Sequence, residues 1–183
     1  MSPVSDHSKR YGFTLIELMI VIGIVGILAT IAIPTLIKFQ LRAKAAEVKG
    51  NLAAIRVSEE AYFGEFGFFV SALAVPPAVG AVKVTWPLAP GTAHGFNTIG
   101  WNPTGNVYFQ YAVATNGANS SFTAAGRSDI DGDGAYNTWG YVRPVEGTAG
   151  GVVGPFGTCQ ATGVQDGLKL VGPCDAASGR SEF

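Results

Sequence analysis

The most constraining feature of the sequence is one carboxylate, Glu17, near the start of a long apolar segment. The segment runs from Phe13 to Ile37, and its only other polar side chains are those of Thr14, Thr30 and Thr35. It is long enough to cross a bilayer, which takes about 20 apolar residues. A carboxylate at the centre of a membrane helix costs roughly 2.5–3.5 kcal/mol, and less toward an end. Glu17 is therefore expected to have a function and a partner.

We expect that partner to be an amine created by cleavage of the chain. If the chain is cut between Gly12 and Phe13, the new α-amino group lies four residues before Glu17, about one helical turn away. Within one molecule the amine and the Glu17 carboxylate can pair only with each other. Between neighbouring molecules in a low dielectric an unmatched charge is costly, so the same pair fixes the register of one molecule against the next. The pattern predicts staggered packing.

The first third of the chain resembles the type IV prepilins. The residues that carry this resemblance are Lys9, Arg10, Gly12, Phe13, Glu17, Gly23, Gly26 and Pro34. The resemblance implies that a prepilin peptidase on the cytoplasmic face of the membrane cuts after Gly12 and methylates the Phe13 amine. It also implies that an assembly machinery in the inner membrane, driven by cytoplasmic ATPases, extracts the mature subunit into a helical filament.

Two properties of the apolar segment leave its interpretation open. The segment could instead be a secretory signal, because Thr30-Ile31-Ala32 could serve as a small-residue cleavage site. Basic residues stand on both sides of the segment, so their count does not fix its orientation. The resemblance implies a cytoplasmic N-terminus and a periplasmic head in the inner membrane before assembly, and an extracellular pilus after it.

Pro34, Gly23 and Gly26 interrupt the helical pattern of the apolar segment. Pro34 leaves the carbonyl of Thr30 without its helical donor, and the two glycines lower helix propensity while permitting close approach of other helices. We expect the stretch between Gly26 and Pro34 to kink or partly melt in a filament. A mild kink in an intact helix is the alternative for the free subunit.

The predicted fold class is α+β, a long N-terminal helix packed on a small antiparallel sheet. The expected parts are a removed leader (1–12), a transmembrane and polymerisation segment (13–37), an amphipathic continuation of the helix (38–66) and a globular head (67–183). Apolar residues recur at helical spacing after the membrane segment, at Leu41, Ala45, Val48, Leu52, Ile55 and Tyr62. Glu59 lies on this stripe, and the sequence offers no reason for it.

The head is predicted to contain a long connecting loop followed by strands. The helix should end near Gly64 to Gly67, and residues 68–105 should form the loop, with a short strand at 82–86. Strands are then expected at 107–113, 121–125 and 138–142, because aromatic and β-branched residues gather there between turn signals.

Two cysteines, Cys159 and Cys174, are the only ones in the chain. A disulfide between them suits an oxidising compartment and agrees with the disulfide-bounded C-terminal region common in pilins. It would stabilise the head by about 3 kcal/mol in the chain-entropy model. Free thiols are the alternative, whereas a metal site lacks further ligands nearby.

Asp129, Asp131 and Asp133 alternate with other residues ahead of glycines, which matches the opening of a calcium loop. The acid that would close that motif is absent, because Gly140 occupies its position. Asp-Gly-Asp-Gly between strands also suits a tight hairpin turn. The sequence favours the turn and leaves structural calcium as the alternative; no other cofactor is expected.

An enzyme is not expected. Removal of the leader takes His7 away and leaves His94 as the only histidine, and no nucleophile motif or phosphate-binding loop is present. The near-neutral charge indicates no particular partner. Basic residues between Lys38 and Arg56 could contact lipid or DNA phosphates, although a solvated helix face is the more ordinary reason for them.

The sequence therefore predicts a structural protein, a type IV pilus subunit that polymerises with itself and serves adhesion, surface motility or DNA uptake. A pseudopilin of a type II secretion system is the alternative within the superfamily, and a minor pilin remains open. A third hypothesis is a membrane-tethered binding module that never polymerises.

Overall fold

The computed structural model describes residues 12–87, 95–164, 167–175 and 178. The chain divides into two compact units, Met1–Phe39 and Gln40–Phe183. One helix, α1 (Leu15–Phe66), contributes to both. The strands are β1 (Ala72–Val75), β2 (Val84–Thr85), β3 (Asn106–Val107), β4 (Gln110–Thr115), β5 (Phe122–Ser128), β6 (Asn137–Arg143) and β7 (Val171–Pro173).

The second half of α1 buries the predicted apolar stripe, except that Tyr62 is only partly buried. Its buried residues are Leu41, Ala45, Val48, Leu52, Ile55 and Glu59. The spacing of three and four places them on one face of the helix. The helix ends where expected: Gly67 has a φ of +80°, and its N–H donates to the carbonyl of Phe63 at 2.8 Å. A glycine in this left-handed conformation is a common end for a helix, because it has no Cβ to clash.

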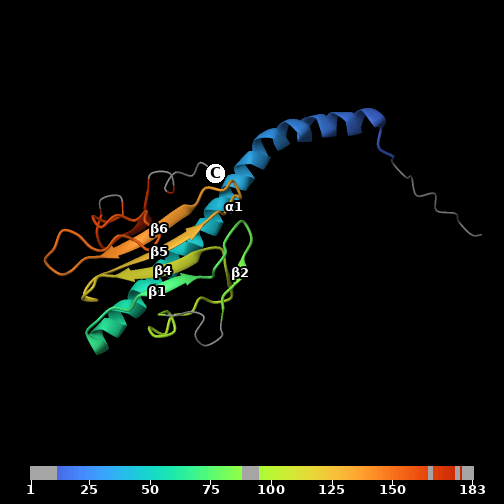
Figure 1. The fold of residues 1–183 in the computed structure, drawn as a ribbon. Helices are drawn as coiled ribbons and strands as arrows, with labels where there is room; N and C mark the ends of the chain where they lie inside the picture. Colours follow the sequence, from blue (N-terminus) through green and yellow to red (C-terminus); the bar gives the residue numbers. More distant parts are fainter. Residues whose placement is uncertain (1–11, 88–94, 165–166, 176–177, 179–183) are drawn as a thin grey trace, which may run out of the picture. The chain divides into compact units, whose positions relative to one another are not determined.

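The head contains an antiparallel sheet in the order β1-β4-β5-β6-β7, and β2 pairs with β3 in a second, two-stranded sheet. Figure 1 shows the second half of α1 running across one face of the larger sheet. Contact is close at Gly126 in β5, where a Cβ would lie 2.6 Å from Cγ2 of Val48 and 3.1 Å from the Tyr111 ring. The predicted α+β class, a helix packed on a small antiparallel sheet, is confirmed.

One expected strand, 107–113, is two strands in the structure. β3 ends at Val107 and β4 begins at Gln110, and the residues between them belong to neither. The cause lies in α1: the carboxylate Oε1 of Glu47 accepts the N–H of Tyr108 at 2.8 Å. A backbone donor engaged by a side chain cannot serve a strand partner at the same time. The prediction of one continuous strand was wrong.

The expected loop 68–105 also contains more structure than predicted. β1 lies inside it and pairs with β4, so this region contributes an outer strand of the main sheet. The expected strand at 82–86 is present as the shorter β2. β7, which pairs with β6 near the C-terminus, was not predicted either. Both missed strands have at most four residues, too short for a clear alternating pattern.

Glu59 is the charged residue among the buried residues of α1, and the structure explains its position. It is fully buried, and its Oε2 accepts the N–H of Val70 at 3.1 Å. Glu59 thereby ties the segment after the helix back onto α1. Its other oxygen, Oε1, has no hydrogen-bond partner among the described residues. Burial raises the pKa of Glu59 from 4.5 to about 7.

This pKa predicts that the stability of the head falls as the pH rises. Between pH 4.5 and 7 the folded protein keeps a proton on Glu59 that the unfolded chain releases. The free energy of unfolding therefore declines across that range, by about 2–4 kcal/mol. Glu59→Gln keeps an acceptor for Val70 without an ionisable group and should lose this part of the decline. Denaturant unfolding of the full-length protein in detergent, followed by tryptophan fluorescence, measures the difference.

Glu60→Gln is the matched control. Glu60 is partly exposed and pairs with Arg143, whose Nε lies 3.2 Å from its Oε1. This variant should keep the decline between pH 4.5 and 7 that the unmodified protein shows. Equal pH dependence in Glu59→Gln and the unmodified protein would contradict the assignment.

Candidate functional site

The start of α1 is closed by a pair of reciprocal hydrogen bonds between Thr14 and Glu17. The Glu17 N–H donates to Oγ1 of Thr14 at 3.3 Å. In return, Oε2 of Glu17 accepts the N–H of Thr14 at 2.9 Å and its hydroxyl at 2.8 Å. This is a capping box, in which the first and fourth residues of a Thr-x-x-Glu sequence satisfy helix donors that have no partner within the helix.

The capping box gives Glu17 a partner that the sequence analysis missed. The Thr-x-x-Glu spacing of Thr14 and Glu17 is a sequence signal of a helix start. Phe13, whose amine is the expected partner of Glu17, is 88% exposed in the uncut chain. Its pairing with Glu17 of a neighbouring molecule stays a prediction.

The first unit presents an apolar helical surface that is open to the surroundings. By length and composition, α1 is long and apolar enough to cross a membrane. None of its apolar 18-residue stretch is buried inside the molecule. At Gly23 and Gly26 an added Cβ would meet no atom within 4 Å. Both glycines thus leave backbone open to a partner helix, which is what close packing in a membrane or a filament uses.

The helix is continuous through Pro34 in this single chain. Two threonine hydroxyls near the proline bond to helix carbonyls: Thr30 donates to Ile27 at 2.7 Å and Thr35 donates to Ile31 at 2.9 Å. Such bonds keep side-chain hydroxyls satisfied in an apolar environment. The free chain therefore matches the intact-helix alternative, and melting between Gly26 and Pro34 in a filament stays a prediction.

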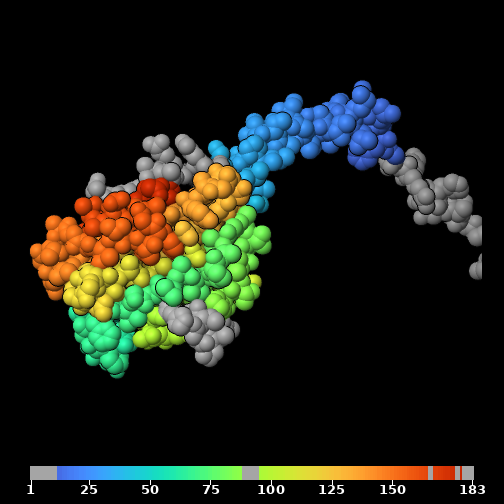
Figure 2. Space-filling model, in the orientation of Figure 1, coloured from blue at the N-terminus to red at the C-terminus, as the bar shows by residue number. Residues whose placement is uncertain are grey.

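The C-terminal part of the head is joined by the expected disulfide, Cys159–Cys174. The bond packs on β6, where a Cβ on Gly140 would lie 2.5 Å from Sγ of Cys159 and 2.8 Å from Sγ of Cys174. Only a glycine leaves room for the sulfurs at this point of the strand. Figure 2 shows the residues that follow β6, in orange and red, as one continuous layer on the visible face of the head.

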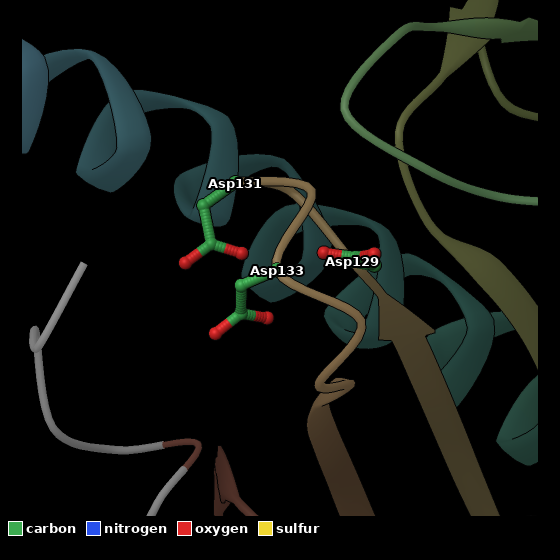
Figure 3. A group of neighbouring side chains, drawn as sticks. All are labelled: Asp129, Asp131 and Asp133. Atoms are coloured by element: carbon green, nitrogen blue, oxygen red, sulfur yellow. The ribbon is translucent and has the colours of Figure 1, made fainter.

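The three aspartates of the acidic loop lie together between β5 and β6 (Figure 3). Their nearest carboxylate oxygens all lie within 4.8 Å of one another, and Asp131 and Asp133 are exposed. The register pairs Ser128 with Asn137, so the loop is 129–136. It is not the tight hairpin that the sequence favoured, because eight residues separate the paired ends.

Hydrogen bonds within the loop occupy part of this carboxylate cluster. Asp129 accepts the N–H groups of Gly132 and Gly134, at 2.8 and 3.1 Å. Asp133 accepts the N–H of Ala135 at 2.7 Å. Gly132 and Gly134 have φ of +81° and +89°, so the loop needs glycine at both positions. The aspartates thus shape the loop, and they also offer hard oxygen atoms of the kind that calcium prefers.

Calcium titration separates the two roles of the acidic loop. If the loop binds calcium, millimolar calcium should raise the melting temperature of the full-length protein, because binding to the folded state stabilises it. Asp131 is exposed, and its side chain is not among those whose hydrogen bonds shape the described loop. Asp131→Asn should therefore abolish the rise in calcium while leaving the melting temperature in chelator unchanged. A calcium-independent melting temperature in the unmodified protein would leave the aspartates with the turn alone.

Two basic residues of the amphipathic half of α1, Lys49 and Arg56, contact aromatic rings of the head. Lys49 lies over the Trp139 ring at 4.7 Å, and Arg56 lies over the Tyr141 ring at 5.3 Å. Such cation–π contacts stabilise packing by about 0.5–1 kcal/mol at exposed sites. These contacts give the two cations a structural role, and DNA contact stays a prediction without support here. His7 and His94 lie outside the described residues.

Comparison with known proteins finds relatives through the N-terminal segment. The model of the prokaryotic N-terminal methylation motif matches residues 7–33. The type IV major pilin PilA of Myxococcus xanthus is 54% identical over 59 residues, which are 32% of this chain and 27% of that protein. The N-terminal third of the chain is thus similar to that of type IV pilins. The resemblance to the prepilins is confirmed.

Two further relatives show how wide this pilin similarity is. The type IV major alpha-pilin of Moraxella bovis is 50% identical over 54 residues, 30% of this chain and 34% of that protein. The type II secretion system core protein G of Pseudomonas aeruginosa is 37% identical over 57 residues, 31% of this chain and 40% of that protein. The chain thus spans about a quarter to two fifths of the length of these relatives. None of them is named as an enzyme, in agreement with the expectation for this chain.

Proposed function

We propose that the chain is the structural subunit of a type IV pilus. The observation that carries this proposal is the helix segment of the first unit: a prepilin motif followed by an open apolar surface with a single carboxylate at its start. Large apolar surface of this kind is unstable in water and requires lipid or other apolar helices around it. A membrane supplies the first before assembly, and sister subunits supply the second in a filament.

In this proposal, a prepilin peptidase cuts after Gly12 and methylates the amine of Phe13. The subunit waits in the inner membrane with its N-terminus cytoplasmic and its head periplasmic. An assembly machinery in that membrane then moves it into a homopolymer, where Glu17 meets the Phe13 amine of another subunit. Gly23, Gly26 and Pro34 allow the helices to pack and adjust in the core. Adhesion, motility or DNA uptake are the proposed uses of the filament.

A pseudopilin of a type II secretion system is the second candidate. It is favoured by the similarity to a core protein of such a system, and a calcium requirement of the acidic loop would add to it. Identities of 54% and 50% to major pilins, against 37% to the secretion protein, favour the pilus. Electron microscopy of sheared surface material, with the subunit identified by mass, decides between long surface filaments and none.

The processing step gives a direct prediction. The mature subunit isolated from membranes should begin with an N-methylated Phe13, because the proposed pairing needs an amine at that residue. Mass spectrometry of the N-terminal peptide measures both the cleavage point and the added methyl group. A mature protein that begins at Ile33 would identify the apolar segment as a secretory signal and remove the proposal.

The capping box allows a sharp test of Glu17. Glu17→Gln removes the charge but keeps a side chain that completes a capping box, whereas Thr14→Val removes the cap hydroxyl and keeps the charge. The proposal predicts that Glu17→Gln lowers surface filaments at least tenfold, while the protein remains in the membrane. Thr14→Val should still assemble. Quantified filaments in sheared fractions, with immunoblots of membranes, provide the measurement.

Each outcome of this comparison has a distinct meaning. Loss of filaments in both variants would show that the helix start, not the charge, is what assembly needs. Normal filaments in Glu17→Gln would contradict the charge pairing. A chain whose function is unchanged by Glu17→Ala, with no filaments in any strain, would be the membrane-tethered module.

A further inference from the structure

A cleft of ≈ 610 Å³ opens on the head unit beside the first turns of α1 that belong to that unit. One wall is formed by the helix and the other by residues next to the small β2–β3 sheet. The lining residues are Gln40, Ala43, Lys44, Glu47, Lys83 and Tyr108. The four helical residues have the spacing of a single helix face, so their side chains point into the same space.

Two lysine ammonium groups share one aromatic ring in this cleft. Nζ of Lys44 lies 5.3 Å from the centre of the Tyr108 ring, and Nζ of Lys83 lies 5.1 Å from it. Lys44 is held in place because it donates to the carbonyls of Ala81 and Ile130, at 3.2 and 3.3 Å. An ammonium has three donors, which leaves one beyond these two carbonyls.

Glu47 neutralises only part of this positive charge. Its Oε1 is occupied by the N–H of Tyr108, and its Oε2 lies 3.6 Å from Nζ of Lys83. Lys83 is 47% exposed, and an ion pair this long and this exposed contributes little to stability. Lys83 can therefore turn toward another anion at small cost. The two lysines and one carboxylate leave a net charge of about +1 in the cleft.

We propose that this cleft binds the phosphate of an anionic lipid headgroup while the subunit is anchored in the bilayer. The inference rests on the proposed function, because it needs residues 13–37 in a membrane. Gln40 follows Ile37 by three residues. Three residues span at most about 10 Å in any conformation. The headgroup layer on each side of a bilayer is roughly 5–8 Å thick, so the cleft begins within or beside it.

The charges around the cleft favour a lipid over a nucleic acid. Further along α1, the next cations, Lys49 and Arg56, lie over aromatic rings of the head, so the basic residues beyond the cleft do not extend it into a row of free charges. Asp131 follows Ile130 in the acidic loop and opposes any anion near Lys44. Affinity for a dissolved phosphate should accordingly be low. A bilayer compensates by holding headgroups at high local concentration.

The experiment compares lipids retained by the full-length subunit. The protein is reconstituted into nanodiscs of equal phosphatidylglycerol and phosphatidylcholine, re-extracted in mild detergent, and its bound lipids are counted by native mass spectrometry. We expect phosphatidylglycerol to be enriched over phosphatidylcholine, and Lys83→Gln to reduce the enrichment about fivefold, the usual effect of one basic residue near an anionic surface. Free glycerol phosphate at millimolar concentration should compete weakly.

A control variant and a set of outcomes separate a loss of lipid binding from a loss of the fold and from a failure of the proposed pilus function. Lys169→Gln changes an exposed lysine that does not line the cleft and should keep the enrichment. Equal retention of both lipids, or enrichment unchanged in Lys83→Gln, would overturn the cleft proposal. If filaments still form and still depend on Glu17, the proposed function stands without it. Failure of the subunit to enter the nanodiscs would overturn both.

Discussion

The head depends on the burial of one stripe of α1 against the five-stranded sheet. Val48 approaches the sheet where β5 has Gly126, and Leu52 and Ile55 are fully buried behind it. This packing also determines where polar groups can go. Glu47 and Glu59 lie on or beside the stripe, and each takes a backbone N–H from the head, at Tyr108 and Val70. The helix therefore positions both the β2–β3 region and the segment leading to β1.

The same helix has two different surfaces along its length. In the head unit one apolar stripe of the helix is buried, whereas the large apolar side chains from Phe13 to Phe39 are exposed. Burial contributes about 25 cal/mol for each Å² of apolar surface removed from water, so a segment this apolar gains far more from lipid or sister helices than from solvent. The described part of the head, whose core is already buried, has fewer exposed large apolar side chains. The drive for association thus resides in the first unit.

Sequence alone predicted what periodicity and composition encode. The stripe of α1, its end near Gly67, the strands around 121–125 and 138–142 and the disulfide all follow from local signals. The break between β3 and β4 could not be predicted, because it is caused by Glu47, about sixty residues earlier in the chain. The same holds for Glu59, whose partner is a backbone N–H beyond the helix. Thr14 is different, because the Thr-x-x-Glu spacing that predicts its cap is local and visible in the sequence.

The capping box changes the physical meaning of Glu17 before assembly. Two hydrogen bonds from Thr14 reach Oε2 of its carboxylate, so the acid already has a partner within one molecule. A cap of this kind contributes about 0.5–2 kcal/mol. A charged amine from a neighbour in a low dielectric offers a stronger partner, since ionised hydrogen-bond pairs are roughly twice as strong as neutral ones. In the proposed filament such a cap is weak enough to be exchanged: it would hold the carboxylate at the helix start until a neighbour's amine replaces Thr14.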